Sequence, residues 1–545
     1  MPEKTANETV KDLGRKYLDF ILEFFPSAGT MMGLYHLDDV LDTINRDKIE
    51  QLVKQTKSMK EEAEAVDINE LGVSDSIDLR LLKSELHKTL RSFEVEKDYA
   101  SEPSFYPEVC FNAVYGILFR HQDKLKEKAG ALLSRLRGIP EFLSEGKKLL
   151  ETPPRLFVEN AIESAESGKV LFEESLEELF SGELSTYKNE YEDLKIKALD
   201  ALEDYKKFLK EELLEKASPD FAVGREMFED RLKNDYFLTE SADEIEALGK
   251  ELFEVTEKEL IKLAAEIDPS KKWVDLVKEN KIKHPEPDKM IEAYNETVAK
   301  IKQFIIDRDL VSFPPGEKME IIFTPPFERH LIPWAAFFPC AHFDKTSAGH
   351  FVVTPPNPEF PPEKQALQMQ EHNYNKMILN AVHEAYPGHH LQLCHARENP
   401  SIIRGLAGCN LFVEGWALYT EELMQEIGYL TEPMQILFQL KDKVWRASRI
   451  IIDVGLHVKG MPMEEAMNIL TRTIGYSEHA ALTEVKRYCR TPTQPLSYLT
   501  GLTKIQQMKK AFMSKYPESG LKQFHDKVLA CGSIPPALIA EEIGI

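Results

Sequence analysis

Helical periodicity limits the possible folds of this 545-residue chain most strongly, because it dominates the first 310 residues. In residues 241–268, apolar side chains recur at about helical spacing, and the run stops at Asp268-Pro269. Ser241 can cap this helix while Glu244 reaches back to it, which would form a capping box. Further amphipathic runs occupy residues 9–25, 46–66, 76–93, 125–150, 192–217 and 288–307. The sequence therefore predicts a mainly α fold.

The pattern changes after Pro315, where short β-rich segments bounded by Pro, Gly and Asp predict a small sheet. The predicted strands are residues 320–323, 335–338 and 350–354. Helical periodicity returns from about Gln365 and continues nearly to the end. We therefore expect a helical lobe over residues 1–310 and a second region over residues 311–545. The two would face each other across a cleft, with no long flexible linker between them.

Charge and composition exclude several classes of protein. A formal net charge of −24 argues against a broad nucleic-acid-binding face, which has to be basic. No stretch approaches the roughly 18 apolar residues that cross a membrane, and the first residues lack the pattern of a leader peptide. The six cysteines lie far apart and form no C-x-x-C pair, which is typical of reduced thiols. We therefore expect a cytoplasmic protein without nucleic-acid or membrane partners.

Residues 381–392, AVHEAYPGHHLQ, begin like the helix of a zinc peptidase, with His383 followed by Glu384. The second histidine of such a helix normally comes four residues after the first, but Pro387 occupies that position. In an ideal helix, residue 389 falls on the far side from His383. Residue 390 returns to the same face, but about 10 Å farther along the axis. A regular helix therefore cannot give one ion two histidine ligands here.

Pro387 and Gly388 can supply the distortion that the site needs. Proline has no N–H and its ring clashes with the carbonyl four residues earlier, while glycine adopts conformations that other residues avoid. A widened turn that absorbs two extra residues would bring His389 into the position of the missing ligand. A turn that makes His390 the ligand would have to absorb three extra residues, so we prefer His389 as the ligand and keep His390 as the alternative.

A catalytic zinc site needs a third protein ligand, an open position for water, and a base near that water. Glu414 lies in the apolar run LFVEGWALYTEEL (411–423), and a buried carboxylate needs a partner. Glu384 is too close to His383 in sequence to bind the same ion, but it is well placed as the general base. The sequence therefore predicts one zinc ion per chain, bound by His383, His389 and Glu414.

These motifs resemble the DUF885 family, which groups with the gluzincin-like zinc metallopeptidases. The resemblance rests on HEAYPGHHLQ and LFVEGWALY, and it extends to FFPSAGTMMGLYHLDD (24–39), RASRIIIDVGLH (446–457) and EVKRYCRTPTQPLSYLTG (484–501). It implies a two-lobed, mainly helical metallopeptidase-like fold with a deep cleft, a small sheet beside the active-site helix and a bound zinc. The resemblance also implies His383, His389 and Glu414 as metal ligands and Glu384 as the base.

The resemblance also points to Tyr498 as a side chain near the cleft. The last of these signatures usually runs P-G-Q-A-L-S-Y, and this chain has Thr493 and Pro495 in place of its Gly and Ala, while Gln494 is kept. Tyr498 could donate its hydroxyl proton to an oxyanion in the transition state. His457 and Tyr476 are further candidates for this donor.

Other residues are candidates for substrate binding. Arg487 or Arg490 could bind a substrate carboxylate through two hydrogen bonds. Residues 346–353 predict an edge strand opened by Gly349, to which a peptide could add as a further strand. The substrate-binding candidates are Gly349, Arg487, His390 and His457.

The sequence is thus typical of a zinc-dependent hydrolase that cleaves short peptides, with Glu384 as general base. One alternative is a zinc amidohydrolase acting on a non-peptide amide or an amino-acid conjugate. Another is a non-catalytic helical binding protein with a vestigial site, although such a protein has no reason to retain the base. A substrate panel distinguishes the first two. The oligomeric state is left open by the sequence.

Overall fold

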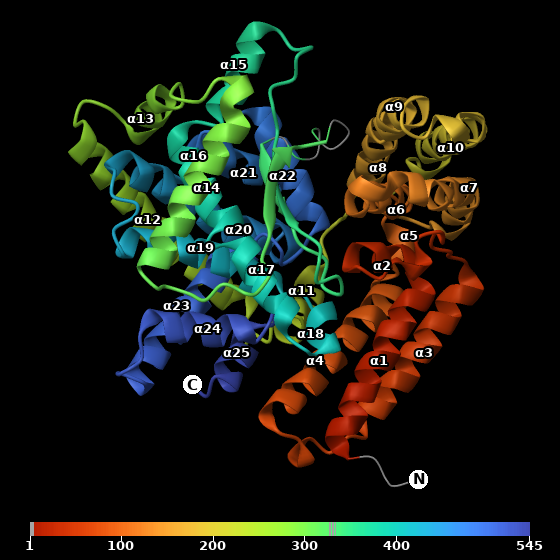
Figure 1. Cartoon of the computed structure of the whole chain (residues 1–545), viewed down its shortest axis with the longest axis horizontal. Coiled ribbons are helices and arrows are strands. Elements are labelled where there is room, and N and C mark those ends of the chain that lie inside the picture. The colour runs from red at the N-terminus through yellow and green to blue at the C-terminus, as the bar shows by residue number, and fades with distance from the viewer. Residues whose placement is uncertain (1–4, 326–328, 330–331, 333) are drawn as a thin grey trace.

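The structure is a computed structural model that describes residues 5–325, 329, 332 and 334–545 (Figure 1). Helices α1–α10 lie on one side of the molecule, and the later helices lie with the sheet on the other side. The first group comprises α1 (Ala6–Phe24), α2 (Pro26–Met32), α3 (Arg46–Glu64), α4 (Val73–Leu90), α5 (Asp98–Ser101), α6 (Phe105–Arg120), α7 (Leu125–Leu149), α8 (Arg155–Ser167), α9 (Leu176–Ser181) and α10 (Lys188–Phe208). The mainly α fold predicted from the sequence is confirmed.

The second group begins with helices that precede the sheet and continues to the end of the chain. Its members are α11 (Gly224–Asn234), α12 (Ala242–Ile267), α13 (Trp273–Asn280), α14 (Met290–Asp307), α15 (Pro362–Gln370), α16 (Tyr374–Asn380), α17 (His389–Glu398), α18 (Ile402–Leu406), α19 (Asn410–Glu426), α20 (Pro433–Val458), α21 (Met463–Ile469), α22 (Glu478–Arg490), α23 (Ser497–Lys515), α24 (Leu521–Ala530) and α25 (Pro536–Glu542). Within the described residues, no helix combines the length and the apolar character that a membrane crossing requires.

Local sequence signals set the bounds of α12. The Ser241 side chain accepts a hydrogen bond from the backbone N–H of Glu244, whose carboxylate accepts one from the backbone N–H of Ser241 at 2.8 Å. This is the predicted capping box, and the helix ends at Ile267 before Asp268. The six other predicted runs correspond to α1, α3, α4, α7, α10 and α14.

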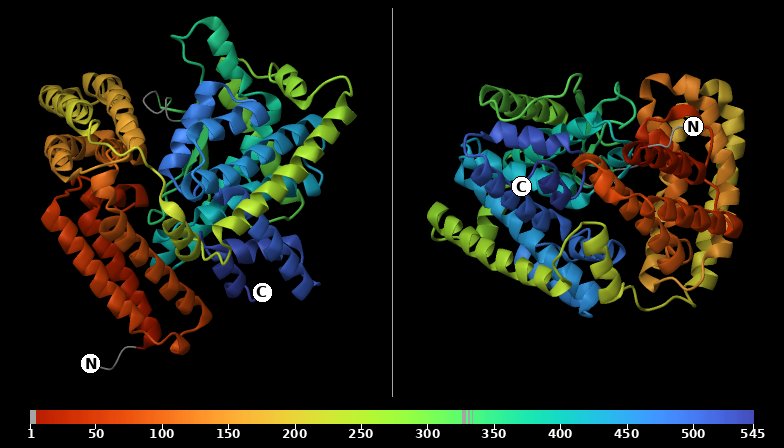
Figure 2. Two further views of the ribbon diagram at one scale, coloured as in Figure 1. Left: turned by 180° about the vertical axis from the view of Figure 1, so that it is seen from behind. Right: turned by 90° about the horizontal axis from the view of Figure 1, so that it is seen from below.

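The buried side chains form two clusters that do not follow a single boundary in the sequence. Helix α12 runs against α20, and the backbone at Gly249 approaches the Ile450 side chain so closely that a Cβ there would lie 2.8 Å from it. One buried cluster lies within residues 41–213, whereas the other joins α1, α3 and α4 to α11 and the elements after it. Helices α11–α14 therefore belong with the C-terminal half, as both views of Figure 2 show.

The sheet has three strands in the order β1-β3-β2. The strands are β1 (Met319–Phe323), β2 (Ala335–Phe338) and β3 (Gly349–Val353). Strand β3 pairs with β1 in parallel and with β2 in antiparallel orientation, so Phe351 lies opposite both Ile321 and Phe337. The prediction that Gly349 opens an edge strand is therefore wrong. Both sides of β3 are already paired, and no added strand can bind there.

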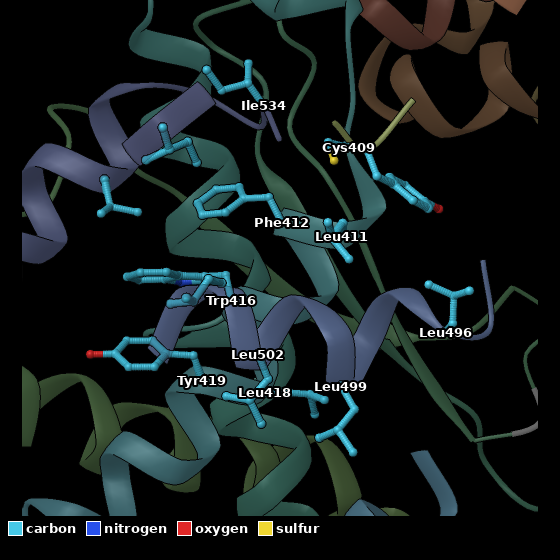
Figure 3. Packing of buried hydrophobic residues seen from close by; sticks show 14 of the residues in the cluster. Cys409, Leu411, Phe412, Trp416, Leu418, Tyr419, Leu496, Leu499, Leu502 and Ile534 are labelled. Atoms are coloured by element: carbon cyan, nitrogen blue, oxygen red, sulfur yellow. The ribbon is translucent and has the colours of Figure 1, made fainter. Parts of the chain in front are cut away.

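Helices α19 and α23 touch through their backbones. A Cβ at Gly415 would lie 2.5 Å from the carbonyl carbon of Gly501, so neither position has room for a side chain. Around this crossing, large apolar residues of the two helices interdigitate and are buried (Figure 3). They include Leu411, Phe412, Trp416 and Leu418 of α19 and Leu499 and Leu502 of α23.

Candidate metal centre

The helix that carries His383 is interrupted directly after it. A π-helical turn, Ala381–Ala385, follows α16, and Tyr386 then takes an extended conformation before α17 begins at His389. A Cβ at Gly388 would lie 1.9 Å from the carbonyl oxygen of His383, so only glycine fits this turn. The widened turn expected at Pro387-Gly388 thus begins a few residues earlier.

Three side chains meet at this interruption. Nε2 of His383 lies 3.7 Å from Oε2 of Glu414, and Nε2 of His389 lies 3.5 Å from the same oxygen. One possible ligand atom of each residue lies within 4.8 Å of the others, and no second such group occurs among the described residues. Two ligand atoms of a tetrahedral zinc ion are about 3.4 Å apart at ordinary bond lengths. The spacing is therefore compatible with a metal ion between the three side chains.

The donor set fits zinc as well as the spacing does. Oε2 of Glu414 is buried and has no hydrogen-bond partner in the part of the chain that the structure describes. Such an oxygen is costly to bury, and a cation between the three side chains would satisfy it. Two imidazoles and a carboxylate are also a common ligand set of catalytic zinc. His383, His389 and Glu414 therefore fit a zinc ion.

Glu421 supports the cluster from behind and was not predicted from the sequence. Its Oε1 lies 2.7 Å from Nδ1 of His383, and the side chain is 6% exposed. Arg446 of α20 lies 3.6 Å from the same oxygen, so the carboxylate keeps a compensating charge. The only signal in the sequence is the position of Glu421 two helical turns after Glu414, on the same face of α19.

Electrostatics inside the cluster favour a charged carboxylate. Burial disfavours ionised Glu414, but the facing imidazoles of His383 and His389 outweigh this effect and hold the pKa of its carboxyl well below the usual value. Burial alone would lower the pKa of His383, but Glu414 and Glu421 raise it to about 9. A metal ion that binds here has to displace the His383 proton, so metal affinity rises with pH.

Glu384, the predicted general base, lies beside His383 in the chain. It follows His383 in the π-helical turn and is half-buried. Its charge contributes to the raised pKa of His383, after the larger effects of burial, Glu414 and Glu421. Its carboxylate forms no hydrogen bond or ion pair with any described residue, so it is free to accept a proton from a bound molecule.

The structure separates His390 from the cluster, which corrects its assignment to substrate binding. The side chain is fully buried, and its Nε2 lies 2.5 Å from Oε1 of Glu317. Tyr386 and Lys302 also bond to this carboxylate. Although burial alone would raise the pKa of Glu317, these three partners lower it to about 2. His390 therefore belongs to a separate polar cluster around Glu317. Of the two histidines, His389 is the one that lies beside Glu414.

Tyr498 is brought toward the cluster by the crossing of α19 and α23. It lies one turn before Gly501, whereas Glu414 directly precedes Gly415. Burial raises the pKa of the Tyr498 hydroxyl, and the charge of Glu414 adds to this effect. The guanidinium of Arg449 lies over the Tyr498 ring, 4.4 Å from its centroid.

Two residues behind Tyr498 determine the direction of its hydrogen bonds. Nη1 of Arg487 lies 2.9 Å from Oε1 of Gln494, and because a guanidinium can only donate, the amide oxygen has to face it. The amide nitrogen of Gln494 then faces the Tyr498 hydroxyl oxygen at 3.4 Å and donates to it. The hydroxyl proton of Tyr498 is therefore free for another acceptor.

Arg487, the predicted ligand of a substrate carboxylate, already bonds two side chains of the protein. Besides Gln494, it donates through Nη2 to Glu484 at 2.9 Å. The alternative, Arg490, bonds Glu102 and another carboxylate of the first helical group, so it joins the two sides of the molecule.

The two remaining candidates, His457 and Tyr476, pack against other side chains of the protein. His457 is 1% exposed, and its Nε2 bonds the backbone oxygen of Tyr488 at 3.0 Å, so the assignment of His457 to substrate binding is corrected. Tyr476 packs against Trp445, with ring centroids 5.6 Å apart.

A buried carboxylate in α20 fixes the loop before Tyr498. Asp453 is fully buried and accepts hydrogen bonds from the backbone N–H groups of Thr493 and Leu496, each at 3.2 Å. Thr493 has φ +70°, in the left-handed region that favours glycine. Asp453 therefore stabilises a turn that the side chain of Thr493 disfavours.

Comparison with known proteins is consistent with this fold. Residues 26–543 match the family described as "Bacterial protein of unknown function (DUF885)", and no curated protein matches the chain. A solved structure from Shewanella oneidensis, described as "a putative lipoprotein of unknown function", is 21% identical over 97% of this chain and 98% of its own, with a TM-score of 0.81. A structure from Colwellia psychrerythraea, described as "the putative lipoprotein", is 17% identical over 99% and 98%, with a TM-score of 0.82. At these identities the two proteins share the fold with this chain.

Proposed function

The chain belongs to the DUF885 family, and from its metal centre we propose that it is a gluzincin-like, zinc-dependent hydrolase that cleaves short peptides. One observation carries the proposal. His383, His389 and Glu414 each present a ligand atom at a spacing that suits a metal ion, and one of these atoms, Oε2 of Glu414, is buried without a hydrogen-bond partner among the described residues. The free carboxylate of Glu384 follows His383 directly in the chain. A purely structural ion-pair cluster has no need of that carboxylate.

The chemistry can be divided between the metal and the side chains. Zinc, when bound, would act as a Lewis acid toward a carbonyl group and toward water. Glu384 would accept a proton from the attacking water and pass it to the leaving amine. Tyr498 would donate its free hydroxyl proton to the oxyanion that develops on the carbonyl oxygen. Arg487 and Gln494 would keep that proton directed away from their own side of the ring.

Burial of the centre favours small or extended substrates. His383 and His389 are each 8% exposed, and the side chain of Glu414 is 17% exposed. A folded protein surface does not reach ligands buried to this degree, whereas a short peptide in a deep cleft would. Short peptides are therefore the substrate class that we propose.

The test combines metal content with hydrolysis by the purified full-length chain. We expect about one zinc per chain, and cleavage of members of a short-peptide panel that stops when a chelator removes the metal. Glu384→Gln should retain zinc and fold but lose most activity, on the order of 100-fold or more. Glu398→Gln, at the end of α17, is the control, because Glu398 pairs with exposed Lys345 away from the centre and should leave activity unchanged.

The outcomes separate the competing functions. Cleavage of acyl amides but not of peptides would replace the peptidase with an amidohydrolase. Full zinc occupancy without hydrolysis of any substrate, or activity that survives Glu384→Gln, would contradict the catalytic proposal. A wild-type chain that binds no zinc even after incubation with the metal would overturn the metal site itself.

A further inference from the structure

Two cysteines distant in sequence meet beside the helix that follows the metal cluster. Cys340 lies just after β2, and Cys394 lies within α17. Their sulfur atoms are 3.8 Å apart, although the residues are 54 positions apart in the chain. A disulfide bond needs a sulfur–sulfur distance of about 2.05 Å, so a shift of roughly 1.8 Å, shared between the two side chains, would close it.

One of the two sulfurs borders a cavity through which a small oxidant can arrive. Cys340 is 7% exposed and lines a cavity of about 610 Å³, where α2 and α6 face α17. Cys394 is fully buried behind it and does not line the cavity. The two cysteines therefore have different access, as an attacking and a resolving thiol require.

Positive charge gathers near Cys340, the cysteine that lines the cavity. Arg397 lines the same cavity, and its Nη1 is fixed by the backbone oxygen of Ser347 at 3.0 Å. Arg120 also lines it and bonds the backbone oxygen of Pro339 at 2.9 Å, directly before Cys340 in the chain. Guanidinium groups beside a thiol favour the thiolate, which is the nucleophilic form.

The acidities of the thiols agree with this division. The pKa of Cys340 is lowered, first by the hydrogen bond that the Cys394 thiol donates to it and then by the charges of Arg397 and Arg120. The pKa of Cys394 is raised by the same hydrogen bond, in which it is the donor, and by burial. Burial raises the pKa of Cys409 to about 11 and that of Cys489 to about 12. At neutral pH, fewer of these two thiols are in the nucleophilic thiolate form than in an ordinary cysteine.

We propose that Cys340 and Cys394 are a site of reversible oxidation, at which a hydroperoxide converts the two thiols to a disulfide. The Cys340 thiolate attacks hydrogen peroxide, so that a sulfur–oxygen bond forms and the oxygen–oxygen bond breaks. Cys340 becomes a sulfenic acid, and the other peroxide oxygen leaves as hydroxide, which takes up a proton from solvent to form the first water. Cys394 then attacks that sulfur, and the oxygen leaves as water with the Cys394 proton. The two sulfurs together lose two electrons, and these reduce hydrogen peroxide to two molecules of water.

The bond would join the loop after β2 covalently to α17. Because α17 begins at His389, oxidation would tie one end of the sheet to the helix that presents a ligand of the candidate metal centre. The site itself depends on the thiol pair alone, so it is independent of whether the protein hydrolyses peptides.

The experiment uses the full-length chain, reduced, freed of reductant and then treated with hydrogen peroxide. Thiols are counted after denaturation, and peptides are mapped by mass spectrometry. We expect the loss of two of the six thiols, a mass lower by two hydrogens, and a linked peptide pair containing Cys340 and Cys394. A dithiol reductant should restore both thiols.

Variants make the result specific. Cys340→Ser and Cys394→Ser should each abolish the linked species, whereas Cys489→Ser should still lose two thiols. Thermal melting of each variant shows whether it is folded, and the map of the wild-type chain stands even if one is not. The proposal is overturned if both thiols survive peroxide, if Cys340 proceeds to sulfinic acid without linking, or if the linked pair involves another cysteine.

Discussion

Nδ1 of His383 lies 2.7 Å from Oε1 of Glu421. Glu421 lies on α19, two helical turns after Glu414. This contact keeps one imidazole proton on Nδ1, so that the proton a metal ion displaces is the one on Nε2, which faces the ligand cluster. One helix thus contributes both a candidate metal ligand and the group that orients another ligand. Several properties of the site follow from contacts of this kind.

Loss of the Glu421 carboxylate should weaken metal binding without removing a ligand. We expect Glu421→Gln to reduce zinc affinity by about 10-fold to 100-fold, because the proton and the ring of His383 are less firmly oriented. Competition with a chromophoric chelator measures the dissociation constant. Glu422→Gln is the matched control, since Glu422 is adjacent and pairs with Lys443 instead. Equal affinities of the two variants would contradict this role of Glu421.

The adjacent histidines should have opposite effects when each is replaced. His389→Ala should abolish stoichiometric zinc binding. His390→Ala should retain zinc but lower the free energy of unfolding by about 2 kcal/mol, because the buried, charged Glu317 loses a hydrogen-bond partner. Metal analysis and urea denaturation of the two variants separate the effects. Loss of zinc in His390→Ala alone would show that the ligand is His390.

Reversing one hydrogen bond should impair Tyr498 without changing its shape. In Gln494→Glu, the carboxylate still accepts from Arg487, but it now also accepts the Tyr498 proton. We expect kcat to fall about 10-fold to 100-fold, as it should in Tyr498→Phe, with KM and zinc content little changed. The double variant should be no worse than either single one. Additive losses would mean that Gln494 acts independently of Tyr498.

Relief of backbone strain should stabilise the loop before α23. Thr493 has φ +70°, so Thr493→Gly should raise the free energy of unfolding by about 1 kcal/mol. Its backbone N–H still donates to Asp453 in the variant. Thr491→Gly is the control, because Thr491 has φ −126° and its replacement should only destabilise. Urea denaturation compares the three proteins.

Acid should destabilise the fold through buried neutral histidines. Burial lowers the pKa of His525 to about 4, and its two nitrogens bond the backbone oxygen of Leu310 and the hydroxyl of Tyr419. Because the unfolded chain binds this proton at higher pH than the folded one, the stabilisation is complete above about pH 6.5 and is lost as the pH falls toward 4. In His525→Gln the fall of unfolding free energy over this range should be shallower, by at most about 1.4 kcal/mol per pH unit. An unchanged slope would exclude His525 as a contributor.

The sequence predicts what is local along the chain. The capping box at Ser241 and the break at Pro387-Gly388 follow from residues within a few positions of each other, and the structure has both. The break brings His389 beside Glu414 because glycine allows a close approach to the His383 carbonyl. Local chemistry was therefore sufficient for most helices and for the candidate ligands.

Pairings between distant segments could not be read from the same patterns. The order of the strands places Gly349 in the centre of the sheet, although its own segment has the pattern of any short strand. Arg487 bonds Glu484 and Gln494, but an arginine without these partners could stand in the same local sequence. The approach of Cys340 to Cys394 likewise depends on how the loop after β2 packs on α17. Long-range packing decides each of these.

The backbone contact between Gly415 and Gly501 also limits how the protein can move. Helices packed without intervening side chains have no rotamers that could change to let them slide, so α19 and α23 should behave as one rigid unit. Glu414 and Tyr498 then keep a constant separation during turnover. Any opening that admits a substrate must arise from a hinge elsewhere, and the boundary between the two buried clusters is where relaxation measurements should find it.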